Sequence, residues 1–320
     1  MKISYNWLRE YLDFDAGPEE LSVILTSLGL EVEGMEEWVS VRGGMKGVVV
    51  GKVLICEKHP DADRLSVTTV DAGGTDPLHI VCGAPNVAAG QLVAVALPGT
   101  MVYHGNEQFE IKRSKIRGQL SEGMICAEDE LGIGDDHEGI MVLDSSARVG
   151  MPAAEYFGVT TDTVFEIGLT PNMIDCSSHF GVARDLAAYF NLQKPVRARL
   201  PEITSIDKES DTGAISITVE APEACIRYSG LTIRGIKVGP SPAWLQTRLR
   251  AIGLHPINNV VDITNFVLHE TGQPLHAFDV AAIKGGTVRV RHLPDKTRFV
   301  TLDGVERTLA STDLMICNQE

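Results

Sequence analysis

The chain has 320 residues, more than one ordinary hydrophobic core accommodates, so two or three domains are expected. With 44% hydrophobic and 22% charged residues, its composition is typical of a folded soluble protein and excludes a disordered one. The net charge of −15 argues against a protein that binds nucleic acid mainly through non-specific charge, because such domains are usually basic.

Neither a membrane segment nor an export signal is expected. The longest apolar run, near residues 92–102, is broken by Pro98 and Gly99 and is too short to span a bilayer. Arg9 and Glu10 interrupt the N-terminal stretch where a signal peptide needs an apolar core. The six cysteines are scattered without a CxxC pair, which predicts free thiols in a reducing cytoplasm, neither a zinc site nor a disulfide framework.

The first part of the chain predicts a helix followed by a block of strands. PEELSVILTSLG carries a proline and two acids at its start, an apolar row at helical spacing and Gly29 as a stop. From about Val39, five short β-type runs are separated by Gly, Pro, Asn or Asp, which predicts a small barrel or sandwich. GMICAEDELGIG ends this block, with a short helical turn over Ala127–Leu131.

Helical signals return after about Gly150. TPNMIDCSSHFGVARDLAAYF has apolar residues at helical spacing, with Asp175 or Ser177 as the expected cap. The polar run Ser205–Gly213 is read as a linker, and the alternating strand AISITVE opens a new domain. Two further helices are expected there: SPAWLQTRLRAIG, with Ser241 as N-cap and Pro242 at the first position, and NNVVDITNFVLHETG, with Asn258 or Asn259 as cap and Gly272 as stop.

One basic ribbon stands out against the acidic background. FEIKRSKIRG has four cations in six residues, and alternation would turn Phe109, Ile111 and Ile116 inward with a bulge near Arg113 and Ser114. The outward cations could contact a phosphate backbone. A charge run is more often only a solvated face, and that reading is at least as strong on local evidence. The outward set is Lys112, Lys115 and Arg117.

A second basic stretch, EKHPDADRLSV, forms a turn. Proline and two aspartates favour the turn, because aspartate side chains hydrogen-bond the nearby backbone. Lys58, His59 and Arg64 bracket it. HPDAD could also be read as a metal site, but the order of its residues fits no standard ligand spacing.

GQPLHAFD places an ionisable imidazole, His276, between Leu275 and Ala277 after a proline turn. Three readings are open: a packed structural histidine, a metal ligand, or a group that acts on a substrate. On local evidence alone, a satisfied core histidine is favoured.

Several long motifs together carry a family resemblance. VGKVLICEKHPDADRLSVTTVDAG, HIVCGAPNV, VAVALPGT and IKRSKIRGQLSEGMICAEDELGI are similar to the tRNA-binding OB-fold module of synthetase-associated proteins. With MKISYNWLREYL, LTPNMIDCSSHFGVARDLAA, SPAWLQTRL and PINNVVDITNFVLHETGQPLHAFD, the whole chain resembles the bacterial phenylalanyl-tRNA synthetase β subunit, in the family's order. Family members are much longer, so the chain is expected to be an N-terminal portion that ends within the editing domain.

The resemblance implies a multidomain α+β architecture. An OB-fold barrel at 39–152 would be inserted in a small N-terminal α+β domain formed by 1–38 and 153–204. Residues 205–320 would form the first part of an α+β editing domain of the B3/B4 type. The implied function is tRNA binding and hydrolytic editing of tyrosyl-tRNA(Phe), which supports ATP-dependent charging of tRNA(Phe) with phenylalanine by the α subunit.

The resemblance also implies roles for individual residues. The tRNA contacts would come from Lys58, His59, Arg64, Lys112, Lys115 and Arg117, with weak and salt-sensitive affinity because the module is acidic overall. The editing pocket would be lined by Thr264, Asn265, His276 and His255, where the proline turn brings His276 back toward the helix. A neutral imidazole there could orient the hydrolytic water or the terminal ribose hydroxyl.

Two positions depart from the family. His255 stands where relatives commonly carry arginine, which puts a cationic contact in doubt, and Met173 stands where relatives often carry arginine after TPN. No ATP-binding or magnesium-binding motif appears, and no metal site is expected. The implied ATP and Mg²⁺ would act at the aminoacylation site on the α subunit, within an α2β2 heterotetramer that has no membrane partner.

Two alternatives from other classes stay open. One is a stand-alone, non-catalytic tRNA-binding or chaperone-like OB-fold protein. The other is a free-standing editing protein, which would need its domain to close before Glu320. The PINNVVDITN and GQPLHAFD segments favour the synthetase reading, because simple OB-fold binders have no such region.

Overall fold

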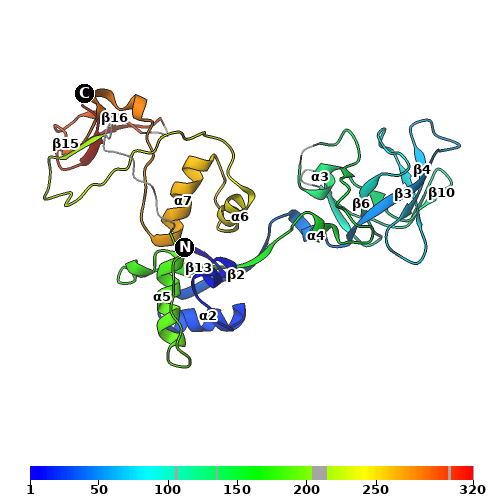
Figure 1. Cartoon of the computed structure of the whole chain (residues 1–320), viewed down its shortest axis with the longest axis horizontal. Coiled ribbons are helices and arrows are strands. Elements are labelled where there is room, and N and C mark those ends of the chain that lie inside the picture. Colours follow the sequence, from blue (N-terminus) through cyan, green and yellow to red (C-terminus); the bar gives the residue numbers. More distant parts are fainter. Residues whose placement is uncertain (105–106, 135, 204–214, 302–303, 320) are drawn as a thin grey trace.

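The computed structural model describes all residues except 105–106, 135, 204–214, 302–303 and 320, and it folds the chain into three bodies (Figure 1). The barrel lies apart from the other two, which pack against each other near the N-terminus. Helices and mixed sheets occur together, so the α+β class is confirmed. The predicted linker Ser205–Gly213 lies outside the described residues.

The N-terminal body is built on a three-stranded antiparallel sheet in the order β1 (Lys2–Ser4), β13 (Thr161–Gly168), β2 (Glu31–Val39). Its middle strand comes from the far side of the barrel in sequence. The helices that cover it are α1 (Tyr5–Tyr11), α2 (Pro18–Ser27) and α5 (His179–Phe190). The predicted helix at 18–29 is confirmed: Pro18 occupies its first turn, and Leu21, Ile24 and Leu25 are buried.

The barrel is a strongly bent sheet in the order β11-β6-β3-β4-β5, with β12 paired to β6. Its strands are β3 (Val48–Lys58), β4 (Ser66–Asp71), β5 (Leu78–Cys82), β6 (Leu92–Ala96), β11 (Met124–Ile125) and β12 (Val142–Leu143). The sheet nearly closes, because the Glu122 N–H donates to the His79 carbonyl at 2.7 Å, just before β11. Val53, Ile80 and Val93 fill the interior. The expected short helical turn is α3 (Glu128–Leu131).

The ribbon FEIKRSKIRG is not one strand, which corrects the sequence prediction. β8 (Glu107–Glu110) pairs with β7 (Met101–His104), whereas β9 (Ser114–Ile116) pairs with β10 (Gln119–Ser121). Ile111 is held by the Pro98-Gly99 turn, since its N–H donates to the Thr100 carbonyl at 2.8 Å and its carbonyl accepts from Gly99 at 2.7 Å. The chain therefore changes direction after Ile111, and Phe109, expected inside, is 42% exposed.

The third body carries two short sheets and two helices. β15 (Thr287–His292) pairs in parallel with β14 (Ser216–Val219) and antiparallel with β18 (Leu314–Cys317), and β16 (Arg298–Val300) pairs with β17 (Glu306–Thr308). α6 is Ala243–Ala251 and α7 is Asn259–Thr271. The short turns that complete the described elements are η1 (Arg42–Met45), α4 (Ala153–Tyr156), η2 (Ile174–Cys176), η3 (Val280–Ala282) and η4 (Lys284–Gly286).

The helix caps test local sequence signals directly. Asn258 caps α7 as predicted, accepting from the Val260 and Val261 N–H groups at 3.1 Å, and Gly272 ends it with φ +79°. The predicted cap of α6, Ser241, is wrong. Pro242 holds the N-cap position, and the Ser241 hydroxyl donates instead to the buried carboxylate of Asp262. The cap of α5 is Ser178, one residue beyond the expected Ser177.

All six cysteines are free, as predicted. Within the described ranges of the chain, no helix is both long and apolar enough to cross a membrane.

Candidate functional site

The first candidate surface lies on the barrel, where the loop between β3 and β4 meets the hairpin β9–β10. The loop closes on itself because the His59 N–H donates to the Leu65 carbonyl at 3.0 Å, and the Leu65 N–H donates to the Ala62 carbonyl at 3.1 Å. Pro60, Asp61, Asp63 and Arg64 point outward from this turn and are exposed. The proline and the two aspartates therefore form the turn that the sequence predicts.

The hairpin β9–β10 displays Arg117 at its tip. Ile116 is paired with Gln119, so Arg117 and Gly118 form a two-residue turn. Both have positive φ, 46° and 88°, as a hairpin turn with the right-handed twist of its strands requires. Glycine adopts this conformation freely, whereas an arginine does so only where the surroundings hold it.

His59 joins the two segments. Its Nδ1 accepts from the Asp61 N–H at 3.0 Å, and its Nε2 lies 3.3 Å from the Ile116 carbonyl oxygen in the hairpin. Only a ring that is neutral, with the proton on Nε2, makes both bonds. The side chain is 5% exposed. Although the sequence suggested that His59 touches tRNA, the structure places its ring against protein on both sides.

The remaining cations differ in how they are partnered. Lys112 lies 3.2 Å from the Glu110 carboxylate. In the described part of the chain, no ion pair engages the four other exposed cations of the predicted set: Lys58, Arg64, Lys115 and Arg117. A phosphate can approach such free cations without first displacing a carboxylate.

Arg64 and Arg117 line one open depression of about 510 Å³, although they lie 53 positions apart in the sequence. Its remaining lining comes from Pro60–Leu65, including the carboxylates of Asp61 and Asp63. A second depression, of about 560 Å³, is lined by residues of β5 and α3 and by Ser114, Ile116 and Ser121 of the hairpin. The hairpin therefore contributes residues to two hollows, each large enough to hold part of a nucleic-acid chain.

The second candidate region is α7 and the turn after it. Thr264 and Asn265 are half-buried on the helix, and the Thr264 hydroxyl donates to the Val261 carbonyl at 2.7 Å. His255 and His276 are both exposed, and the His276 ring lies 6.2 Å from the ring of Phe278. His276 is thus not a packed core histidine, the reading favoured on local evidence.

The predicted pocket residues do not form one bonded cluster. Between the described side chains of His276 and those of Thr264, Asn265 and His255, no hydrogen bond is present. The segment 272–279 has no regular secondary structure and runs along the end of α7. The convergence of these side chains on a substrate stays a prediction.

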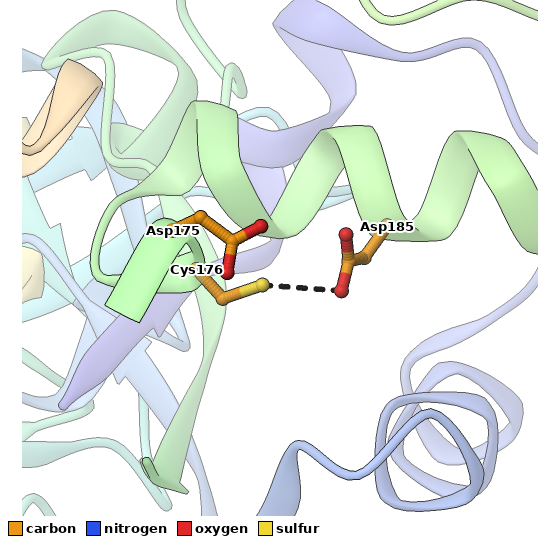
Figure 2. Close-up of side chains that lie close together, drawn as sticks. All are labelled: Asp175, Cys176 and Asp185. Atoms are coloured by element: carbon orange, nitrogen blue, oxygen red, sulfur yellow. Dashed lines mark hydrogen bonds between the residues drawn. The ribbon is translucent and has the colours of Figure 1, made fainter. Parts of the chain in front are cut away.

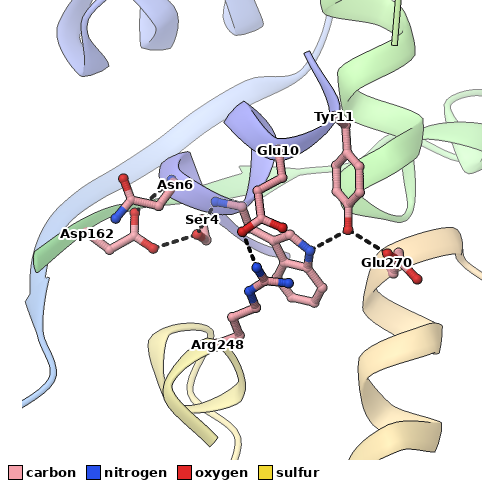
Figure 3. Close-up of polar contacts among 8 residues, drawn as sticks. Ser4, Asn6, Glu10, Tyr11, Asp162, Arg248 and Glu270 are labelled. Carbon is pink, nitrogen blue, oxygen red and sulfur yellow. Dashed lines mark hydrogen bonds and ion pairs between the residues drawn. The ribbon is translucent and has the colours of Figure 1, made fainter. Parts of the chain in front are cut away.

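α7 is instead firmly attached to the N-terminal body, as Figure 3 shows. The Tyr11 hydroxyl donates to the Glu270 carboxylate at 2.8 Å, and Arg248 of α6 pairs with Glu10. The Trp7 ring stacks between His179, at 3.9 Å, and Phe266 of α7, at 4.9 Å. Two helices of the third body therefore rest on α1.

His179 connects the same two bodies through both ring nitrogens. Its Nε2 accepts from the Ser4 N–H at 3.0 Å, and its Nδ1 donates to the His269 carbonyl at 2.8 Å. Burial lowers the pKa of His179 to about 3, so the ring is neutral at physiological pH. Sequence reasoning missed Trp7 and His179, because each fits a buried helical position and nothing local indicates a contact between domains.

A third cluster brings Asp175 and Cys176 of η2 together with Asp185 in the middle of α5 (Figure 2). The thiol donates to the Asp185 carboxylate at 3.1 Å, and Arg184 pairs with Asp175 at 3.2 Å. Burial, and then the Asp185 carboxylate, raise the pKa of the Cys176 thiol to about 12. A protonated thiol is neither a nucleophile nor a strong metal ligand. The hydrogen bond between Cys176 and Asp185 therefore has a structural role.

Family models match two segments of the chain. Residues 48–152 match a putative tRNA binding domain, and residues 224–320 match a B3/4 domain. Curated relatives match along nearly its whole length. The phenylalanine–tRNA ligase β subunit of Porphyromonas gingivalis is 56% identical over 319 residues, that of Bacteroides fragilis 55% over 322, and that of Salinibacter ruber 48% over 335.

The chain matches the N-terminal portion of phenylalanine–tRNA ligase β subunits. It is covered to 99–100% by these three relatives and spans 39% of the length of each. The relatives are named as subunits of an aminoacyl-tRNA synthetase. Among solved structures, the C-terminal domain of Plasmodium vivax p43 aligns with 32% of this chain and 56% of its own at 24% identity, with a TM-score of 0.24, too low to support an argument.

Proposed function

We propose that the barrel of this β-subunit chain binds tRNA(Phe) through the surface shared by the β3–β4 loop and the hairpin β9–β10. The observation that carries this proposal is the pair of arginines, Arg64 and Arg117, which are exposed, unpaired within the described residues, and line one depression. The tRNA-binding family match over residues 48–152 supports it. Since the protein has a net charge of −15, binding is weak and depends strongly on salt.

The third body contributes to hydrolytic editing of tyrosyl-tRNA(Phe), and its B3/4 match supports this role. Phenylalanine and tyrosine differ by one hydroxyl, which an apolar pocket rejects poorly, so a second hydrolytic site raises fidelity. In this proposal the editing site is lined by Thr264, Asn265, His255 and His276. Because His276 is exposed, it is free to meet the end of a bound tRNA.

The full synthetase charges tRNA(Phe) with phenylalanine, using ATP and Mg²⁺ at the α subunit, as an α2β2 heterotetramer in the cytoplasm. The subunit name of the relatives supports an α-subunit partner. The alternative is a non-catalytic, chaperone-like tRNA-binding protein, which needs no hydrolytic residue.

The deciding measurement is deacylation of tyrosyl-tRNA(Phe). This chain and a chain of the full length of its relatives are each assayed with the α subunit, with and without His276→Ala. We expect the longer chain to hydrolyse the ester and His276→Ala to slow it about 100-fold, the usual worth of one positioned acid–base group. An unchanged rate in His276→Ala removes this residue from the mechanism, and no hydrolysis by any form favours the non-catalytic alternative.

A further inference from the structure

We propose that His59 is a positioning residue for RNA binding, which ties the β3–β4 loop to the hairpin β9–β10 so that Arg64 and Arg117 face one stretch of ribose-phosphate backbone. This inference rests on the proposed tRNA binding by the barrel. It assigns His59 no contact with the RNA itself.

The hairpin needs such an attachment because it is small. β9 and β10 share only three residue pairs, and an isolated two-stranded ribbon is marginally stable in water. At its base it is fixed to the barrel, where the Val81 N–H of β5 donates to the Ser121 hydroxyl at 3.1 Å. Near its tip, the hairpin is attached to the β3–β4 loop by the hydrogen bond from His59 Nε2 to the Ile116 carbonyl, at 3.3 Å.

The tie acts directly next to the cations. Ile116 immediately precedes Arg117, and His59 begins the turn that carries Arg64. Fixing Ile116 against His59 therefore fixes the separation of the two arginines across the depression. The positive φ of Arg117, 46°, shows that the tip is held in a conformation that arginine rarely adopts by itself.

Burial explains why His59 works through its neighbours. With 5% of its surface exposed, its ring cannot reach a phosphate, and both nitrogens are already engaged. Its contribution is preorganisation: when two cations are already aligned, binding loses less conformational freedom. Loss of the tie is expected to weaken RNA binding without removing an ionic contact.

Two substitutions separate the two bonds of the ring. His59→Asn keeps an acceptor for the Asp61 N–H, as an aspartate or asparagine does in this type of turn, but is too short to reach Ile116. His59→Gln can place its amide N–H near the Ile116 carbonyl but loses the bond to Asp61. If the tie matters, the glutamine variant retains more RNA affinity than the asparagine variant.

The experiment measures the affinity of the 320-residue chain for a tRNA(Phe) transcript over a salt series. We expect His59→Asn to bind about tenfold more weakly than the unmodified chain, with an unchanged slope of log affinity against log salt, and His59→Gln to restore most of the loss. Arg64→Gln and Arg117→Gln are the controls, and each should lower the slope by about 0.7–0.9. Hydrogen exchange should show faster exchange in 114–121 for His59→Asn, with the Asp61 amide still protected.

The outcomes separate this inference from the proposed function. If the unmodified chain binds and the arginine variants weaken it, but both His59 variants bind normally, the positioning role is wrong. A lower salt slope in His59→Asn would make His59 a direct contact and also overturn it. Equal losses of tRNA affinity in both variants, with unchanged hydrogen exchange in 114–121, would show that His59 contributes only general stability and would overturn the positioning role. If the unmodified chain does not bind tRNA, the proposed function itself fails.

Discussion

Two buried histidines illustrate how single residues connect distant parts of this chain. His59 links the β3–β4 loop to the hairpin β9–β10, and His179 links the N-terminal body to α7. In each case one ring nitrogen donates and the other accepts, which fixes a neutral ring. A third buried group, the carboxylate of Asp262, accepts from the Ser241 hydroxyl and from the Ile257 N–H at 2.8 Å, which ties the starts of α6 and α7 together.

The neutral state of His179 predicts a pH dependence of stability. Burial lowers its pKa in the folded protein to about 3, whereas an exposed histidine in the unfolded chain titrates near ~6.5. Between these values the unfolded state binds the additional proton, so the free energy of unfolding falls as the pH falls, by up to about 1.4 kcal/mol per pH unit. The contribution is fully present above pH ~6.5.

The test compares urea unfolding of the unmodified chain and His179→Gln from about pH 7 down to about pH 4.5. The variant should be less stable at neutral pH, because the partners of His179 lose a well-placed ring. Its stability should nevertheless fall less steeply with acid, since one titrating group is gone. Parallel curves for the two proteins would contradict the assignment.

At the scale of elements, two lysines of FEIKRSKIRG differ in whether an acidic side chain pairs with them. Lys112 leads out of β8 and pairs with Glu110, whereas Lys115 lies on β9 and has no ion pair within the described residues. The difference comes from the break after Ile111, which leaves Lys112 in the connection after β8 and Lys115 within the hairpin β9–β10.

This division predicts unequal effects on tRNA affinity. Lys115→Gln should weaken binding and lower the salt slope by about 0.7–0.9, because it removes one phosphate contact. Lys112→Gln should have the smaller effect, since an exposed pair with Glu110 already offsets its charge, and Glu110→Gln should strengthen binding slightly. Fluorescence anisotropy with labelled tRNA(Phe) measures all three, and a larger effect for Lys112 would count against the assignment.

At the scale of the whole molecule, the three bodies are attached in different ways. Two adjacent chain segments connect the barrel to the N-terminal body, and they are joined where the Ser40 N–H donates to the Thr160 carbonyl at 2.9 Å. The third body rests on α1 through side chains: Phe266 stacks on Trp7, and Arg248 lies 5.8 Å from the Trp7 ring and 5.1 Å from that of Trp244. These ring contacts, with the hydrogen bonds from Tyr11 and His179, hold α7, which bears Thr264 and Asn265.

Phe266→Ala should therefore loosen the docking of the third body without unfolding the first. The ring contributes stacking on Trp7 and an edge contact with Trp244, so its loss should weaken docking by about 2 kcal/mol. We expect a larger radius of gyration in small-angle scattering and a red-shifted tryptophan emission. Ile263→Ala, at an exposed position of the same helix, is the control. Identical scattering from Phe266→Ala and the unmodified chain would show that this contact does not hold the bodies together.

The sequence by itself determined the elements whose signals are local. Apolar spacing with Pro18 and Gly29 predicted α2, Asn258 and Gly272 predicted the ends of α7, and strands separated by turn residues predicted the barrel. These signals depend on the backbone geometry of neighbouring residues, which a chain carries wherever it folds.

Only the tertiary structure decided which residues meet. The break after Ile111, the burial of His59, the exposure of His276 and the stack of Trp7 with Phe266 each depend on a partner far away in the chain. Sequence periodicity records which face of an element is apolar, but not what lies against that face. Hence the candidate cations could be named from the sequence, whereas the tie that aligns Arg64 with Arg117 could not.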